Sequence, residues 1–157
     1  FSRISKQKGT EKHDNLSSSH HALAHCRATT REEGLDSAIT LLTSANAQSE
    51  LGSSAESLTA QLIQNIRKAG QSELLKILRL LAILSLHVGA GQDEWFTTIK
   101  GPLRTLCTRH EDEQIRAAAV ASLAMCCFIC VDDMDTTLAT FDMFEDIICL
   151  SSEGNPP

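Results

Sequence analysis

Cysteine and histidine are the residue types in this sequence best suited to metal or redox chemistry. Cys127 and Cys130 have the two-residue spacing of zinc sites and thiol redox motifs, and Cys126 lies beside them. A zinc site needs a second pair of ligands, and a redox motif of this kind follows a strand and begins a helix. Neither context is present, so we expect these thiols to pack as small apolar side chains of a reduced protein, with metal or redox chemistry as the alternative.

A second cluster of possible ligands lies near the N-terminus, at His20, His21, His25 and Cys26. His21 and His25 are four residues apart, so on a helix they would share one face and could hold one metal ion. No carboxylate or further cysteine follows at ligand spacing. The sequence therefore favours solvated histidines, and we predict no metal site.

Catalytic motifs are absent from the sequence. His110 and Glu111 begin like the His-Glu-x-x-His pattern of zinc proteases, but Gln114 stands where the second histidine should be. Gly89-Ala-Gly91 stops after two glycines and joins two expected helices, unlike a dinucleotide-binding loop. We predict that the protein is not an enzyme and uses no cofactor and no small-molecule substrate.

Charge is unevenly distributed along the 157 residues, whose net charge is −6. Residues 61–110 contain seven basic and three acidic side chains, whereas from Glu111 onward only Arg116 opposes ten carboxylates. The net negative charge argues against broad, non-specific binding to nucleic acid. An acidic group near the C-terminus is expected to be mainly a solvated face, or else a surface for basic partners: Asp132, Asp133, Asp135, Asp142, Glu145 and Asp146.

Apolar residues recur at helical spacing through most of the chain, and no strand-like alternation is present. After a weak helix over 14–26, two helices are expected to begin at the capping boxes Thr30/Glu33 and Ser53/Glu56. Four more are expected over about 73–88, 93–109, 112–131 and 133–150.

Three further residues are expected to shape the helix ends. Gly70 suits the left-handed residue that ends a helix, and Asp93 is expected to cap the next outer helix. Pro102 falls inside that helix and should kink it or start it afresh.

A weak internal repeat relates positions 41 residues apart, and it has three registers at helical spacing: Leu58, Ile99 and Thr140; Leu62, Leu103 and Phe144; Ile66, Cys107 and Ile148. A period of roughly 40 to 47 residues made only of helices is typical of HEAT and armadillo repeats. We therefore predict an all-α, armadillo/HEAT-like, right-handed solenoid of about three helix pairs.

The expected domain organisation has three parts. Residues 1–13 form a basic, disordered lead-in, residues 14–150 an armadillo-like domain, and residues 151–157 a flexible tail. The longest apolar stretches are shorter than the roughly 20 residues that a bilayer requires, so no membrane span is expected. Because the chain opens on Phe1, it is expected to be a fragment of a longer protein.

Two runs carry a resemblance to the interferon-related developmental regulator family. The first covers residues 78–103, with LRLLAILSLHVGAGQ, EWF and IKGPL, and the second is ASLAMCCFIC at 121–130. The similarity extends over roughly 31–150, although Trp95-Phe96 replaces a pair of phenylalanines. The resemblance implies a non-enzymatic armadillo-like scaffold in regulation of gene expression, both nuclear and cytoplasmic. It also implies corepressor and deacetylase complexes as protein partners, or association with idle ribosomes.

The expected interaction surface combines basic side chains with one aromatic: Arg67, Lys68, Lys100, Arg104 and Trp95. A right-handed stack would bring the four bases towards one ridge beside the groove of the solenoid, where they could meet an acidic protein, or RNA and the ribosome. Lys76 and Arg79 are expected to snorkel from an inner helix. Of Trp95 and Phe96, one is expected to pack inside and the other could be an exposed anchor.

Overall fold

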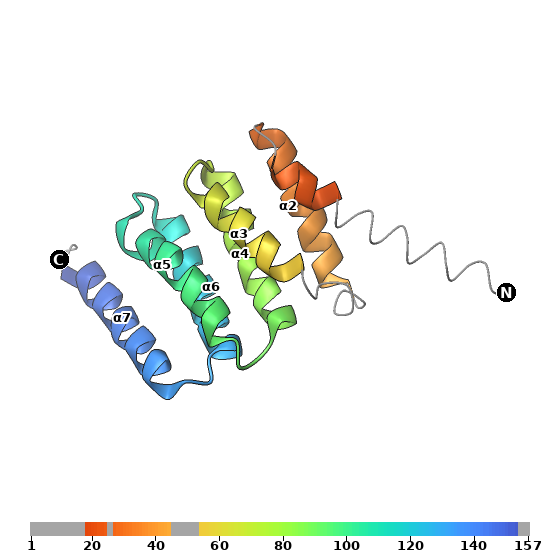
Figure 1. Ribbon diagram of the computed structural model, residues 1–157. Helices are drawn as coiled ribbons and strands as arrows, with labels where there is room; N and C mark the ends of the chain where they lie inside the picture. The colour runs from red at the N-terminus through yellow and green to blue at the C-terminus, as the bar shows by residue number, and fades with distance from the viewer. Residues whose placement is uncertain (1–17, 25–26, 45–53, 154–157) are drawn as a thin grey trace. The chain divides into compact units, whose positions relative to one another are not determined.

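The computed structural model describes residues 18–24, 27–44 and 54–153, and within these ranges it contains helices and no strand (Figure 1). Residues 18–23 are helical, and six longer helices follow: α2 (Ala28–Thr43), α3 (Ser54–Ile66), α4 (Gln71–Val88), α5 (Asp93–Arg109), α6 (Glu113–Cys130) and α7 (Met134–Glu153). The prediction of an all-α protein is confirmed. The expected lead-in at 1–13 lies outside the described residues, and α7 continues to Glu153, past the expected end of the domain.

The chain divides into two compact units, Phe1–His87 and Val88–Pro157, and each is described by itself. The first contains the helical residues 18–23 with α2, α3 and nearly all of α4. The second contains α5, α6 and α7.

Three predicted helix-end signals are wrong. Thr30 lies inside α2, whose N-cap is Arg27 without a side-chain cap hydrogen bond. Gly70 does not have a positive φ; its carbonyl instead accepts from the Leu74 amide at 2.9 Å and so opens α4. Asp93 is the first residue of α5 and not its cap. The capping box at Ser53 lies outside the described residues.

The glycine break between two helices is present as expected, and the other helix ends have causes of their own. Gly89 and Gly91 adopt φ of 83° and 71°, a left-handed conformation that favours glycine and separates α4 from α5. The Asp112 side chain accepts from the Ile115 amide and caps α6. Helix α5 runs through Pro102 without starting afresh.

A buried ion pair joins α2 to α4 in the first unit. Arg31 Nε lies 2.6 Å from Glu73 Oε1, its Nη2 lies 2.9 Å from Glu73 Oε2, and the two side chains are only 5% and 1% exposed. A second polar contact joins α3 to the helical residues 18–23, where the Asn65 side-chain amide donates to the Leu23 carbonyl at 3.0 Å. Polar side chains therefore fix how these helices pack.

Buried positions repeat along the chain in two registers. Helices α3 and α5 bury residues 41 apart, as predicted, at Leu58 and Ile99 and again at Leu62 and Leu103. Helices α2, α4 and α6 follow a shift of 42, which the sequence analysis missed: Arg31, Glu73 and Ile115; Leu35, Ile77 and Ala119; Ile39, Leu81 and Leu123; Leu42, Leu84 and Cys126. Positions related by this shift thus have the same burial in α2, α4 and α6.

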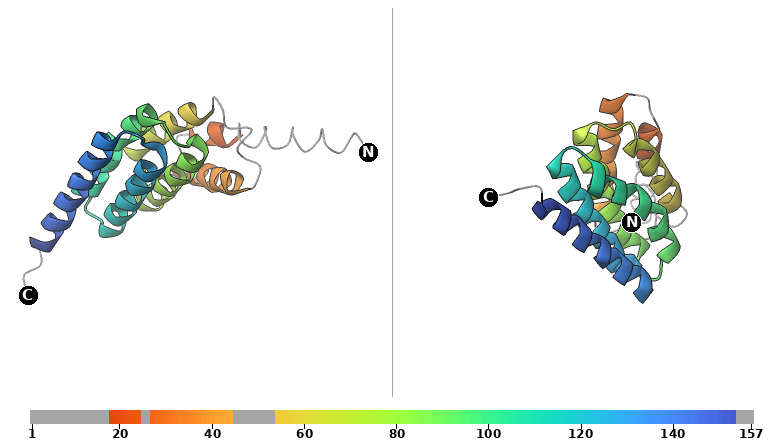
Figure 2. Two further views of the ribbon diagram at one scale, coloured as in Figure 1. Left: turned by 90° about the horizontal axis from the view of Figure 1, so that it is seen from below. Right: turned by 90° about the vertical axis from the view of Figure 1, so that its left-hand side faces the viewer.

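In the second unit α5 packs far more extensively against α6 than α6 packs against α7, which differs from the predicted pairing of α6 with α7. Figure 2 shows these helices from two further sides. The small residues Ala119 and Ser122 of α6 are buried and permit a close approach. The Gln92 amide donates to the Cys130 carbonyl at 2.8 Å, which ties the start of α5 to the end of α6.

The 41-residue register fades in α7. Thr140 is buried and Phe144 half-buried, but Ile148 is 65% exposed, whereas its equivalent Cys107 is buried. The prediction that Ile148 belongs to the core is therefore wrong, because α7 contacts few neighbours within its unit.

Helix α6 has 18 residues with a mean hydropathy of 1.4, so by length and composition alone it could cross a membrane, which the sequence analysis did not expect. Of that stretch, 39% is buried, and core helices of soluble proteins share the same length and composition.

Candidate functional site

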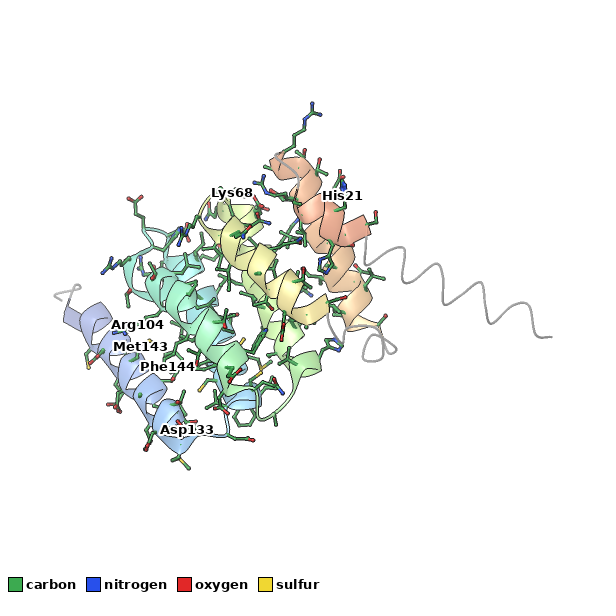
Figure 3. All side chains as sticks on the ribbon, viewed as in Figure 1. His21, Lys68, Arg104, Asp133, Met143 and Phe144 are labelled. Carbon is green, nitrogen blue, oxygen red and sulfur yellow. The ribbon has the colours of Figure 1, made fainter. Side chains whose placement is uncertain are left out.

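The first pair of basic residues follows the end of α3. Helix α3 ends at Ile66, and Arg67 and Lys68 occupy the turn that leads towards α4, where both side chains are exposed. The Lys68 amide donates to the Asn65 carbonyl at 3.1 Å, which fixes the turn. Figure 3 labels Lys68 at this end of the helix. Both cations can therefore meet a partner.

The second pair lies on α5. Lys100 and Arg104 are four residues apart and so share one helical face. Arg104 is exposed, whereas Lys100 is half-buried with its Nζ 5.8 Å from the centre of the Phe96 ring. This cation–π contact orients the Lys100 stem along the helix. Of the pair, Arg104 offers the more accessible charge.

Within the described part of the chain, Arg67, Lys68 and Arg104 form no ion pair. Unpaired guanidinium and ammonium groups at a surface keep their full capacity to bind carboxylates or phosphates. Because the two pairs belong to different units, a common ridge remains a prediction.

Trp95 does not form an exposed anchor, contrary to the prediction. Its side chain is 8% exposed and that of its neighbour Phe96 is fully buried. The residue stands in the first turn of α5, and its apolar ring contributes to packing there. Both aromatics therefore belong to the core, and Trp95 leaves the candidate surface.

The Lys76 side chain was expected to snorkel, but two ion pairs hold it in place. Its Nζ lies 2.7 Å from Asp36 Oδ2 and 3.4 Å from Glu32 Oε2, both on α2. The hydrogen bond to Asp36 is the main reason that the pKa of Lys76 is raised above its usual value. Lys76 therefore helps to join α4 to α2, whereas Arg79 is exposed.

Four of the described cysteines are buried thiols: Cys107, Cys126, Cys127 and Cys130. Burial raises the pKa of Cys107 and of Cys130 to about 11, so both are neutral near pH 7. The prediction that the thiols of Cys126, Cys127 and Cys130 pack in the core is confirmed. Among the described residues, no three or more histidine, cysteine, aspartate or glutamate side chains converge as a metal site.

The histidine cluster is described only in part, because His25 and Cys26 lie outside the described residues. His21 is exposed (Figure 3), whereas His20 is half-buried with its Nε2 buried and unpartnered. Burial lowers the pKa of His20 and favours its neutral form. The expectation of solvated histidines holds for His21 and not for His20.

The acidic group near the C-terminus is exposed at all six positions, as predicted: Asp132, Asp133, Asp135, Asp142, Glu145 and Asp146. Asp133 Oδ2 accepts from the Thr136 amide at 2.8 Å at the start of α7. Hydrogen bonds from Thr136 hold the pKa of the exposed Asp133 carboxyl below its usual range.

Sequence reasoning missed a row of exposed apolar residues on α7. Met134, Leu138, Phe141 and Ile148 are 67%, 53%, 57% and 65% exposed. The signal was available as spacings of four, three and seven residues, which place all four on one helical face. We call these residues the α7 stripe.

Comparison with known proteins supplies one match. The model of the interferon-related developmental regulator family matches residues 2–156. Neither a curated protein nor a solved structure matches the chain. Since the family match spans nearly the whole sequence, the chain belongs to the interferon-related developmental regulator family.

Proposed function

We propose that this chain is a non-enzymatic, armadillo/HEAT-like scaffold that binds other proteins in the regulation of gene expression, as a transcriptional co-regulator. Membership of a family of developmental regulators supports the process. The observation that carries the scaffold role is the repetition of burial at a shift of 42 residues in α2, α4 and α6, because recurrent helical units expose recurrent surfaces. The same family suggests corepressor and deacetylase complexes as partners, in the nucleus and the cytoplasm.

A second candidate function is translational regulation through contact with RNA or the ribosome. The exposed, unpaired side chains of Arg67, Lys68 and Arg104 favour it, together with Lys100. These four bases could neutralise phosphates even in an acidic protein, because binding responds to local charge.

Affinity capture from cell extract, with and without nuclease, tests the two functions against each other. Protein partners that remain after nuclease treatment support the scaffold. Partners lost with nuclease, and an affinity that falls steeply with salt, support phosphate contacts, because each neutralised phosphate releases counterions.

A charge-reversal pair tests whether the α5 bases form the binding surface. Lys100→Glu with Arg104→Glu should abolish capture of the partner. The matched control, Arg27→Glu with Arg79→Glu, makes the same change in net charge at exposed positions outside the proposed surface. Equal capture by both double variants would remove the α5 bases from the site.

A further inference from the structure

Most of the α7 stripe lies outside the face that the repeat uses for packing. The registers buried in α3 and α5 continue in α7 at Thr140, which is buried, and at Phe144, which is half-buried. At about 100° per residue, Thr140 lies about 100° or more around the helix from Met134, Leu138 and Phe141, whereas Phe144 lies about 60° from Phe141 and about 40° from Ile148. Met134, Leu138 and Phe141 thus lie beside the packed face of α7, and Ile148 lies at its edge.

The equivalents of Met134, Leu138 and Phe141 in α5 are polar, whereas the equivalent of Ile148 is the buried Cys107. Residues 41 earlier than Met134 and Leu138 are Asp93 and Thr97, and Thr97 is exposed. The repeat therefore does not require apolar side chains at these positions. Apolar residues that are exposed in a contiguous row usually mark a surface for another molecule.

The charged residues beside the α7 stripe indicate what kind of partner would bind there. Asp135, Asp142 and Asp146 are exposed and fall along one edge of the stripe at about 100° per residue, while Glu145 lies within it. The sequence contains no lysine or arginine from Ala117 to Pro157. Helix α7 therefore supplies no basic side chain that could offset the charge of this edge.

An exposed apolar stripe with an acidic edge argues against two kinds of binding partner and favours a third. A second copy docked by the same face would bring acidic edges together without basic partners, and an anionic membrane or a nucleic acid would be repelled. A helix with apolar side chains at heptad spacing and lysine or arginine along one flank would bury the stripe and neutralise the aspartates.

We propose that the α7 stripe is a docking site for a cationic amphipathic helix of another protein. The spacing of Met134, Leu138 and Phe141 matches the seam of a helix pair, and the acidic edge sets the orientation and selectivity of the partner. This site is distinct from the basic residues of α5, although it rests on the same scaffold role.

Two synthetic helical peptides test the proposal against the full chain by fluorescence anisotropy. Both carry leucine at heptad spacing; one has lysine and the other glutamate on the flank. We expect the lysine peptide to bind roughly tenfold or more tightly than the glutamate peptide, since like charges across an interface oppose association. Phe141→Glu with Leu138→Glu should abolish binding of the lysine peptide.

A charge swap provides the sharper test. Asp135→Lys with Asp142→Lys should reverse the preference, so that the glutamate peptide binds more tightly. The control Glu111→Lys with Glu113→Lys changes the net charge equally at exposed positions off α7 and should keep the original preference. Reversal in both variants would show an effect of net charge alone and would overturn the proposal.

Two further measurements separate alternative outcomes. Circular dichroism confirms that each variant remains helical, and sedimentation shows its oligomeric state. A dimer that Phe141→Glu dissociates would assign the stripe to a second copy and overturn the proposal. Lys100→Glu with Arg104→Glu should leave peptide binding unchanged, so the failure of one proposal does not imply failure of the other.

Discussion

Arg31 and Glu73 stand 42 residues apart and form a two-point ion pair between α2 and α4, with Nε to Oε1 at 2.6 Å and both side chains buried. The equivalent position of α6 is the buried, apolar Ile115. One register of the repeat therefore accepts either a charged pair or a hydrocarbon side chain.

Removing one member of this pair should destabilise the protein strongly. Glu73→Ala removes the carboxylate that pairs with the buried Arg31 guanidinium, and breaking a buried ion pair in this way typically costs about 3 to 5 kcal/mol in the free energy of unfolding. The matched control is Asp36→Ala, which breaks the more exposed ion pair of Lys76 and should cost less than about 1 kcal/mol. Urea unfolding of the three proteins measures both changes.

The double variant Arg31→Met with Glu73→Leu should recover most of the lost stability, because apolar side chains of similar volume avoid the desolvation of two charges. A double variant as unstable as Glu73→Ala would show that this site depends on the charges themselves.

Gly34 should not tolerate alanine, although glycine inside a helix is usually unfavourable. A Cβ at Gly34 would lie 2.9 Å from the Ala22 Cβ and 3.4 Å from the Ser19 carbonyl oxygen. We expect Gly34→Ala to lower the free energy of unfolding by about 1 to 3 kcal/mol through overpacking. Thermal unfolding followed by circular dichroism measures the shift.

The control is Gly101→Ala in α5, where an added Cβ meets nothing within 4 Å. It should not lower the stability, because alanine restricts the unfolded chain and favours helix. A Gly34 variant as stable as this control would contradict the close packing of α2 on residues 18–23.

The sequence predicted the helices far better than it predicted their ends and contacts. Apolar spacing located α4 to α6 within about two residues, because tertiary burial and helical periodicity select the same residues. The caps at Thr30 and Asp93 were wrong because many serine, threonine and aspartate residues match such short motifs by chance.

Interaction surfaces were harder to predict than helices, for a physical reason. In one set of the 42-residue register, Arg31 and Glu73 interrupt the apolar pattern, and they become compatible with burial only as a pair. Trp95 was misplaced because a helical aromatic can face inward or outward, and one sequence does not give the rotation of α5 against its neighbours.

Truncating side chains to alanine should distinguish the buried positions of the 41-residue repeat from its exposed position in α7. Leu103 is fully buried, so Leu103→Ala should cost about 2 to 5 kcal/mol in the free energy of unfolding. Ile148, expected from the sequence to be core, is 65% exposed, and Ile148→Ala should change stability by less than about 0.5 kcal/mol. If chemical denaturation gave equally large losses in the free energy of unfolding for both variants, Ile148 would have to be a core residue.

The thiols should react in an order set by burial. Cys149 is exposed, whereas Cys107 and Cys130 are buried with pKa values raised to about 11. At pH 8, a thiol of that pKa is on the order of 0.1% thiolate, the form that reacts with iodoacetamide. Timed labelling of the native protein, read by peptide mass spectrometry, should therefore modify Cys149 first and the two buried cysteines only after unfolding. At pH 9.5 Cys107 should still be protected, because its access to reagent also depends on opening of the core. Rapid modification of Cys107 at pH 8 would show that α5 does not pack as described, and Cys149→Ser should leave the slow phases unchanged.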